Sequence, residues 1–455
     1  MCWAAMIGRY GGPDEPAHVL RAHSVAQGDL LGAPANGLPG GYRTVTVPAG
    51  IGTGDPACYR HDPATTSACA DGRDVGMETV ATSAGTNPPL YYALVGLPPR
   101  VFGVADDPLA YRLTSVALVA IVIGLVASRL GTRGDRALLA AALITPSCWF
   151  LWGVVNPNAL EIALIALAAT GASHGGDRSE SADWWICVPL AAAVSMRPIA
   201  AVWAIALLVV VELDRHRAPN RRRLVLWAPV AAAVVGVIMW SEWSGLVIDD
   251  ERTARTGSVV TALGNSIGGL PRTGVELIAS LGWLEYWAPW LSVLAWGAAV
   301  VVVVLARPRP PRGTWAVLVG SLVLVPVAFE VLLYDRVGLI WQGRYSLPVP
   351  AIAVVVGLGS STRPFPRRAA RVVVLGAAVG AIATFWTAAH RYAVGVDGSW
   401  WFADADRTSR WLAPGAWVVV YAVTIAIVTT AMFVASGRAA DGELQPIDSA
   451  ADQTM

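Results

Sequence analysis

The most chemically suggestive residues lie near the start of the chain, in the run Pro13-Asp14-Glu15-Pro16-Ala17-His18 followed by Arg21. Adjacent carboxylates beside imidazole and guanidinium groups can act as a general base, or hold a divalent cation that binds a phosphate. If Pro16 starts a helix, both acids lie at its positive N-terminal end. Simple capping of a surface helix is then an alternative interpretation of the same residues.

Two further charges interrupt apolar sequence. Glu161 follows the turn Asn156-Pro157-Asn158 and falls in the first turn of an apolar segment, and Arg197 lies between two hydrophobic runs. Ionisable groups at membrane depth are functional candidates because they are costly to bury. Arg197 could pair with Glu161 as a structural contact, or bind a phosphate with its guanidinium fork.

Two aromatic motifs also carry charges. The first contains Trp283 and Glu285, and the second, Trp341-Gln342-Gly343-Arg344-Tyr345, adds an amide and a guanidinium group. An aromatic belt at the membrane surface explains part of the 20 tryptophans. It does not explain the accompanying charges, since tryptophan, acid, glutamine and arginine also suit sugar stacking and phosphate binding.

These residues must be positioned by a membrane protein. The chain has 455 residues, of which 55% are hydrophobic and 14% charged, and its mean hydropathy is +0.53. An ordinary soluble domain has about 25% charged residues. The net charge of +1 argues against a nucleic-acid partner.

Apolar runs long enough to span a bilayer predict an all-α, polytopic helix bundle with about eleven transmembrane helices. The predicted spans are 112–130, 137–154, 157–174, 183–197, 199–213, 224–242, 287–306, 314–334, 345–361, 369–390 and 414–436. The run Asn87-Pro88-Pro89-Leu90-Tyr91-Tyr92 and the residues after it, up to Val104, predict an interfacial or re-entrant helix with tyrosines at headgroup depth.

Arginines in short loops set the orientation, because cytoplasmic loops retain positive charge. The arginines of the loops and the tail that this rule places together on the cytoplasmic face are Arg129, Arg133, Arg136, Arg178, Arg215, Arg217, Arg221, Arg222, Arg223, Arg307, Arg309, Arg312, Arg363, Arg367, Arg368, Arg371 and Arg438. The predicted organisation is a partly structured extracytoplasmic region at 1–110, a transmembrane domain at 111–436 with an outer loop at 243–286, and a disordered cytoplasmic tail at 437–455.

Residues 1–10 are too short to span a membrane and lack the layout of a signal peptide. A missing upstream helix, lost by truncation or a misassigned start codon, explains the export of the first hundred residues better than translocation by the 112–130 helix. Cys58 and Cys69 lie in a polar outer loop, where an oxidising space favours a disulfide over two free thiols. Metal binding by them is disfavoured because only His61 is nearby.

Taken together, the motifs at 13–18, 87–92, 156–158, 282–285 and 341–345, with the Cys58 and Cys69 loop, resemble the DUF2142 family of bacterial polytopic membrane proteins. Two features depart from that family. Its members usually have a complete helix before the first motif, and an aspartate is expected where Glu285 stands.

The layout of that family is similar to that of GT-C glycosyltransferases, multi-spanning enzymes that take a sugar from a polyprenyl-phosphate carrier. An acidic pair in their first outer loop lies at the active site, which implies a catalytic place for Asp14 and Glu15. The resemblance implies a bacterial plasma-membrane protein with a cytoplasmic C-terminus that transfers a sugar to an envelope glycan or protein.

In this hypothesis Asp14 is the base, and Glu15 orients it or helps bind a cation. Arg197 and Arg344 neutralise the lipid phosphate, Trp283 and Trp341 offer faces to the sugar, and His18, Arg21, Glu161, Glu285 and Gln342 complete the binding site. A transporter or flippase of envelope lipid or polysaccharide is the main alternative. A non-catalytic scaffold of an envelope-synthesis complex is the third.

Overall fold

The computed structural model describes the chain from Met1 to Gly442 with several internal gaps. The residues outside the description are 39–40, 53–55, 71–74, 131–139, 141–143, 174–179, 215–219, 246–257, 307–311, 360–365, 406–411 and 443–455.

The described residues form a helical, multi-pass membrane protein, which confirms the predicted fold class. Five helices are long and apolar enough to cross a bilayer: α5 (Pro108–Leu130), α11 (Asn220–Ser244), α14 (Arg312–Val337), α16 (Arg367–Val394) and α17 (Pro414–Gly442). Five shorter apolar helices accompany them: α8 (Pro157–Ser173), α9 (Glu180–Met196), α10 (Ala200–Asp214), α13 (Trp290–Ala306) and α15 (Pro348–Gly359). Ten of the eleven predicted spans thus have a matching helix.

The eleventh predicted span, 137–154, lies largely outside the described residues, and its described part contains only the short helix α7 (Pro146–Leu151). Most of the arginine loops used for orientation lie outside the description as well, as does most of the predicted tail at 437–455. The turn predicted at Arg197 is present, because α9 ends at Met196 and α10 begins at Ala200.

Helix α8 is the central helix of the bundle. Every described side chain from Pro157 to Gly171 is buried, and α5, α9 and α15 pack around it. A helix that is apolar on all sides must be covered on all sides. The outer helices instead expose apolar side chains such as Leu224, Leu305 and Leu332, as lipid-facing surfaces do.

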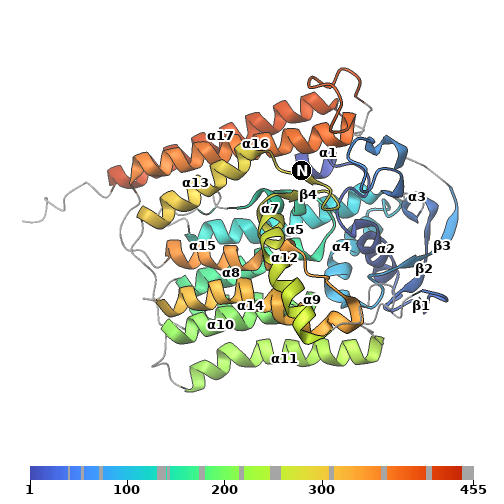
Figure 1. Ribbon diagram of the computed structural model, residues 1–455, viewed down its shortest axis with the longest axis horizontal. Coiled ribbons are helices and arrows are strands. Elements are labelled where there is room, and N and C mark those ends of the chain that lie inside the picture. Colours follow the sequence, from blue (N-terminus) through green and yellow to red (C-terminus); the bar gives the residue numbers. More distant parts are fainter. Residues whose placement is uncertain are drawn as a thin grey trace, which may run out of the picture.

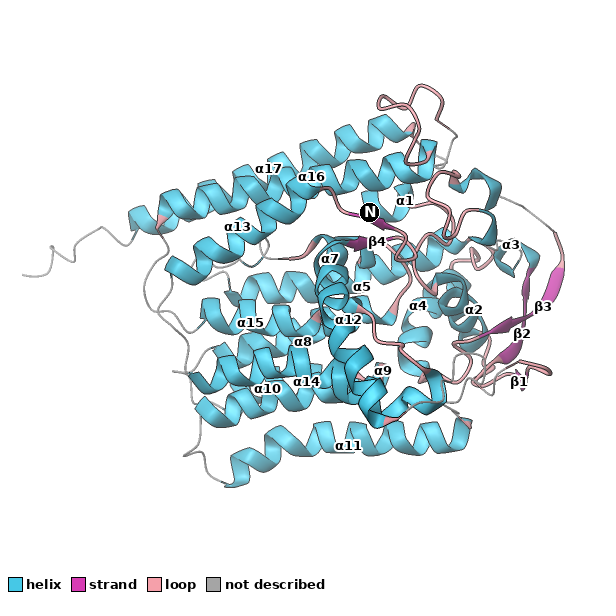
Figure 2. Cartoon of the chain, in the orientation of Figure 1, coloured by secondary structure: helices cyan, strands magenta, loops and turns pink. Residues whose placement is uncertain are grey.

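The N-terminal region caps one end of this bundle. The long helices run side by side, and α2 (Glu15–Ala26), α3 (Ala49–Gly52), α4 (Pro89–Val101) and the strands gather beyond their ends (Figure 1). The strands β1 (Ala33–Pro34), β2 (Arg43–Pro48) and β3 (Met77–Thr82) form an antiparallel sheet in the order β1-β2-β3, in which Val45 pairs with Val80 (Figure 2). The short helix α1 (Cys2–Met6) is buried, with Trp3 packed edge-on against Phe385.

Two predictions for this end of the molecule need correction. The segment 243–286 is not a plain loop, because it contains the helix α12 (Val259–Ala279) and a small hairpin of β4 (Ser280–Leu281) and β5 (Tyr286–Trp287). Its glycines and Pro271 obscured the helical pattern. The predicted helix at 87–104 is α4, but Tyr91 and Tyr92 are fully buried inside the protein and are not exposed to lipid headgroups.

Candidate functional site

Asp14 occupies a strained position just before α2. Its backbone is left-handed, with φ of 60° and ψ of 8°, and its side chain makes no capping hydrogen bond to the helix. Aspartate tolerates this conformation better than most residues, and such outliers gather at functional sites. The capping interpretation is therefore wrong for Asp14, whose carboxylate is aimed elsewhere.

The carboxylate of Asp14 meets the guanidinium group of Arg344. Nη2 of Arg344 donates to Oδ2 of Asp14 at 2.6 Å, and the arginine is buried while the aspartate side chain is 47% exposed. Burial raises the pKa of Asp14, but the charge of Arg344 and its hydrogen bond to the carboxylate, together with the charge of Arg197, outweigh this effect, and the net pKa is lowered. Asp14 is therefore ionised, with one face open to solvent.

Arg344 and Arg197 approach the same tyrosine ring. The guanidinium carbon of Arg344 lies 5.2 Å from the ring centroid of Tyr345, and that of Arg197 lies 4.9 Å from it. Arg197 also donates to Glu161 at 2.8 Å. A continuous group is thus formed by Asp14, Arg344, Tyr345, Arg197 and Glu161. All of them except Tyr345 were predicted to belong to the site, so the structure brings together four predicted site residues.

Arg344 has unused hydrogen-bonding capacity. Among the described residues, its Nε and Nη1 atoms are buried without a hydrogen-bond partner, as is Oε1 of the neighbouring Gln342. Such groups are rare in folded proteins because each one costs free energy. The combination marks this place as one that could receive a polar ligand.

His18 and Arg21 extend the group along α2. Nδ1 of His18 lies 2.9 Å from the hydroxyl of Tyr92, and Arg21 donates to the backbone carbonyl of Asn87 at 3.0 Å. The motif at 87–92 therefore supports the acidic motif directly. The polar side chains of α2 and α4 face each other.

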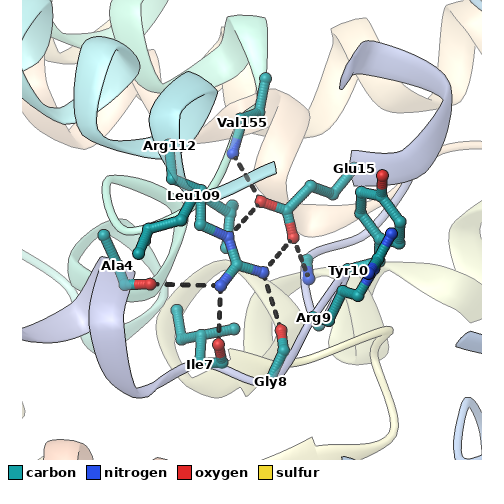
Figure 3. Close-up of polar contacts among 12 residues, drawn as sticks. Ala4, Ile7, Gly8, Arg9, Tyr10, Glu15, Leu109, Arg112 and Val155 are labelled. Carbon is teal, nitrogen blue, oxygen red and sulfur yellow. Dashed lines mark hydrogen bonds and ion pairs between the residues drawn. The ribbon is translucent and has the colours of Figure 1, made fainter. Parts of the chain in front are cut away.

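Glu15 does not share the surroundings of Asp14 but forms a buried ion pair with Arg112 (Figure 3). Its two oxygens each accept from Arg112 at 2.6 Å, and they also accept from the backbone N–H groups of Val155 at 3.0 Å and Gly12 at 3.1 Å. A carboxylate offers about four lone-pair positions. Because four donors occupy them, the geometry gives Glu15 a positioning role and leaves it no ligand position for a cation.

Arg112 completes this pair by binding the N-terminal segment. Its terminal nitrogens also donate to the carbonyls of Ile7 at 2.6 Å, Gly8 at 2.7 Å and Ala4 at 3.2 Å. The start of α5, the residues before α8 and the segment from α1 to α2 are therefore joined through the Glu15–Arg112 ion pair. This network fixes the backbone that carries Asp14.

Glu285 and Trp283 belong to a second cluster around the cysteine loop. The structure joins Cys58 to Cys69 in a disulfide. Arg391 donates to Glu285 at 3.0 Å and to the loop carbonyls of Tyr59 at 2.9 Å, Asp62 at 3.0 Å and Thr65 at 2.6 Å. Both charged side chains are almost fully buried, so they clamp the loop.

Trp283 donates from its indole nitrogen to the carbonyl of Tyr10 at 2.9 Å, with Arg60 over its ring. Trp341 is only 8% exposed, packs against Trp203 and Phe329, and donates to the hydroxyl of Ser346 at 3.1 Å. A buried ring has no free face for a sugar. Its placement gives Trp341 a packing role.

The described residues contain no group of three or more His, Cys, Asp or Glu side chains able to hold a metal ion. Asp14 is engaged by an arginine and Glu15 by four donors. Among the residues of this group, Arg197 and Arg344 thus carry the positive charge that would attract an anion.

The family model described as predicted membrane protein (DUF2142) matches residues 1–356. The chain belongs to the DUF2142 family. This confirms the family predicted from the motifs, and the match includes both the acidic motif and the motif around Arg344. No curated protein matches this DUF2142 protein.

Two solved structures of ArnT from Cupriavidus metallidurans are similar to this DUF2142 protein. The apo structure is 15% identical, with 95% of this chain and 74% of that chain covered and a TM-score of 0.49. The structure bound to undecaprenyl phosphate is 15% identical, with 97% and 76% covered and a TM-score of 0.47. At these values nothing about the activity of the DUF2142 protein follows from either structure.

Sequence reasoning missed three residues of this DUF2142 protein at the end of the bundle that the N-terminal region caps. Arg112 and Arg391 are charges near the ends of apolar helices, a signal that marks functional or structural sites in membranes. Tyr345 stood inside a recognised motif but was not selected, because no sequence rule predicts an aromatic ring between two arginines.

Proposed function

We propose that this protein is a membrane glycosyltransferase that moves a sugar from a polyprenyl-phosphate donor to a cell-envelope acceptor on the extracytoplasmic face of the bacterial plasma membrane. The observation that carries the proposal is the group formed by Asp14, Arg344, Tyr345 and Arg197. It combines one ionised, half-exposed carboxylate with two guanidinium groups held on one ring.

The two arginines suit the leaving group of such a reaction. When the bond between the anomeric carbon and the phosphate oxygen breaks, the polyprenyl phosphate gains negative charge. Guanidinium groups bind phosphate oxygens in a forked geometry, and preorganised charges of this kind lower the barrier where charge develops. The unpartnered Nε and Nη1 atoms of Arg344 supply donors that this phosphate would satisfy.

Asp14 suits the role of the base. The acceptor hydroxyl forms a bond to the anomeric carbon and loses its proton to the carboxylate. In the ligand-free protein the ion pair with Arg344 stabilises the ionised carboxylate and so weakens it as a base. A phosphate that recruits Arg344 would loosen this pair, so that donor binding would make Asp14 more basic.

An apolar cavity next to Arg344 fits the lipid tail of the donor. It has a volume of about 220 Å³ and is lined by Leu347, which directly precedes α15, and by side chains of α5, α7, α8 and α15, among them Ile162 and Val126. Leu347 follows Arg344 by one turn of chain, and its backbone N–H donates to the carbonyl of Arg344. A dry apolar cavity of about 150 Å³ already binds a small hydrocarbon.

The test is a transfer assay with purified protein in lipid nanodiscs, supplied with radiolabelled polyprenyl-phosphate sugars and envelope acceptors. We expect label transfer by the wild-type protein and a loss of at least 100-fold in Asp14→Asn. Asp397→Asn changes an exposed aspartate in an outer loop and is the matched control. Equal transfer by Asp14→Asn and wild type would remove Asp14 from the mechanism, and lipid movement across vesicles without transfer would favour a flippase.

A further inference from the structure

His18 and His23 of α2 each contact the hydroxyl group of a tyrosine through Nδ1. The two hydroxyl groups differ in their second hydrogen-bond partner. Nδ1 of His18 lies 2.9 Å from the hydroxyl of Tyr92, and Nδ1 of His23 lies 2.9 Å from the hydroxyl of Tyr111. A phenol has one proton to donate and can also accept. The second partner of each hydroxyl therefore decides which ring nitrogen of the histidine carries hydrogen.

At His18, the tyrosine hydroxyl is already an acceptor. The side-chain amide nitrogen of Asn87 donates to the Tyr92 oxygen at 2.8 Å, so the single phenolic proton is directed to Nδ1 of His18. Nδ1 is then an acceptor, and in the neutral ring the hydrogen sits on Nε2. At His23, Tyr111 donates to the carbonyl of Ala105 at 3.0 Å, which leaves its oxygen able to accept a hydrogen bond from Nδ1 of His23.

The environment of His18 disfavours a charged ring. Its side chain is buried, and the charges of Arg344 and Arg197 act on it together with that of Asp14 and the hydroxyl of Tyr92. Burial is the largest effect, and the pKa of His18 is lowered to about 3 in spite of the attraction of Asp14. The ring is consequently neutral throughout the physiological range.

The second nitrogen of His18 is available to bind a ligand. Nε2 makes no hydrogen bond to any described residue, and it is not among the buried polar atoms that lack a partner. The ring interacts electrostatically with Asp14 and with both arginines of the group. A hydrogen on Nε2 is therefore available at the place where the acceptor hydroxyl and the donor phosphate would meet.

We propose that His18 is a substrate-binding residue that donates a hydrogen bond from Nε2 to a hydroxyl or phosphate oxygen beside Asp14, and that the Asn87–Tyr92 pair fixes the tautomer that makes this possible. The proposal rests on the proposed transferase function for the identity of the ligand. It assigns His18 to recognition and leaves proton removal to Asp14. Tyr92 and Asn87 are positioning residues.

The tautomers can be measured without any activity. The experiment uses full-length protein with ¹⁵N-labelled histidine in lipid bilayers, and solid-state NMR separates protonated from unprotonated ring nitrogens. His18→Gln and His23→Gln assign the two signals among the six histidines. We expect hydrogen on Nε2 of His18 and on Nδ1 of His23, with His18 still neutral at pH 5. Hydrogen on Nδ1 of His18, or a charged ring at pH 5, would overturn the proposal.

The relay has its own test in the same spectra. Tyr92→Phe removes the hydroxyl that donates to Nδ1, so the His18 signal should become a mixture of tautomers, while the matched change Tyr111→Phe should leave His18 unaltered. An unchanged His18 tautomer in Tyr92→Phe would show that the pair does not fix it.

Ligand recognition is tested by kinetics on the transfer reaction. His18→Gln keeps a neutral donor and should change KM little, whereas His18→Met removes the donor and should raise KM about tenfold with a smaller effect on kcat. An equal KM for both variants would contradict the recognition role. If no transfer is seen at all, the proposed function fails while the NMR result still decides the tautomer.

Discussion

Glu15 and Arg112 form a buried, two-point ion pair in which both carboxylate oxygens lie 2.6 Å from guanidinium nitrogens. The pair connects the first turn of α2 to the first turns of α5. Its side chains are 1% and 6% exposed, so water screens it little. Adjacent acids in the sequence thus have opposite surroundings: Asp14 faces the open site, and Glu15 anchors the backbone behind it.

Breaking this pair should destabilise the protein. Glu15→Gln leaves the Arg112 charge buried and unpaired, a change that typically costs about 3–5 kcal/mol. We expect a lowered Tm and loss of monodisperse protein in detergent. Glu212→Gln is the control, because its partner Arg223 is 40% exposed and such pairs contribute about 0–1 kcal/mol. Similar Tm values for the two variants would contradict the anchoring role.

Binding of a lipid phosphate should depend on Arg344. Replacing it by Gln removes the charge next to Tyr345, and we expect at least a tenfold loss of affinity for polyprenyl phosphate in native mass spectrometry. Arg272→Gln changes an arginine of α12 whose side chain is 75% exposed, and it should bind like the wild type. Undiminished binding by Arg344→Gln would place the phosphate elsewhere.

Filling the apolar cavity should affect long lipids and spare short ones. Ala351→Trp inserts an indole among the cavity side chains, so affinity for a long-chain polyprenyl phosphate should fall several-fold while that for a short-chain analogue stays unchanged. The matched control is Ala378→Trp, in a neighbouring groove beside α13, α16 and α17 that Ala351 does not line. Equal losses for both chain lengths would show that the tail does not use this cavity.

Acidification should destabilise the fold through His18. Its folded pKa is lowered to about 3, while an unfolded histidine has a pKa of about 6.5. Between these values the unfolded chain holds a proton that the folded chain lacks, so stability falls as pH falls, by up to about 1.4 kcal/mol per pH unit.

The measurement is the Tm in detergent at pH 7.5 and pH 5. His18→Gln should reduce the difference between the two values, whereas His61→Gln, in the exposed cysteine loop, should leave it as in the wild type. A pH dependence that is identical in all three proteins would show that His18 is not its source.

The disulfide between Cys58 and Cys69 should stabilise the N-terminal region that caps the bundle. Closing a loop of this length contributes roughly 3 kcal/mol in the chain-entropy model. We expect the double variant Cys58→Ser, Cys69→Ser to show a lower Tm and faster proteolysis in this N-terminal region. Cys187→Ser changes a buried free cysteine of α9 and is the control for loss of a thiol. An unchanged proteolysis pattern would contradict the stabilising role.

Hydropathy was sufficient to predict ten of the apolar helices because a bilayer demands long runs of apolar residues. It could not predict α12, whose glycines and exposed surface resemble a loop, nor the short strands near α2. For the site, charged residues in apolar sequence indicated Arg197, Glu161 and the Asp14 motif. The structure pairs Arg197 with Glu161 and places both in one group with Asp14. It could not separate the surroundings of Asp14 and Glu15, because a left-handed backbone turn at Asp14 decides them.

The clamp of Arg391 on the cysteine loop joins residues 326 to 332 positions apart in the chain. The loop is synthesised early, but its carbonyls can accept hydrogen bonds from Arg391 only after the end of α16 has been synthesised. The cysteine loop therefore reaches its final form only after most of the helices of the bundle have been synthesised. Correct assembly of the helix bundle is thus required before the cysteine loop can be held in place. In a misassembled bundle Arg391 would not bind the loop, and the loop would stay detached.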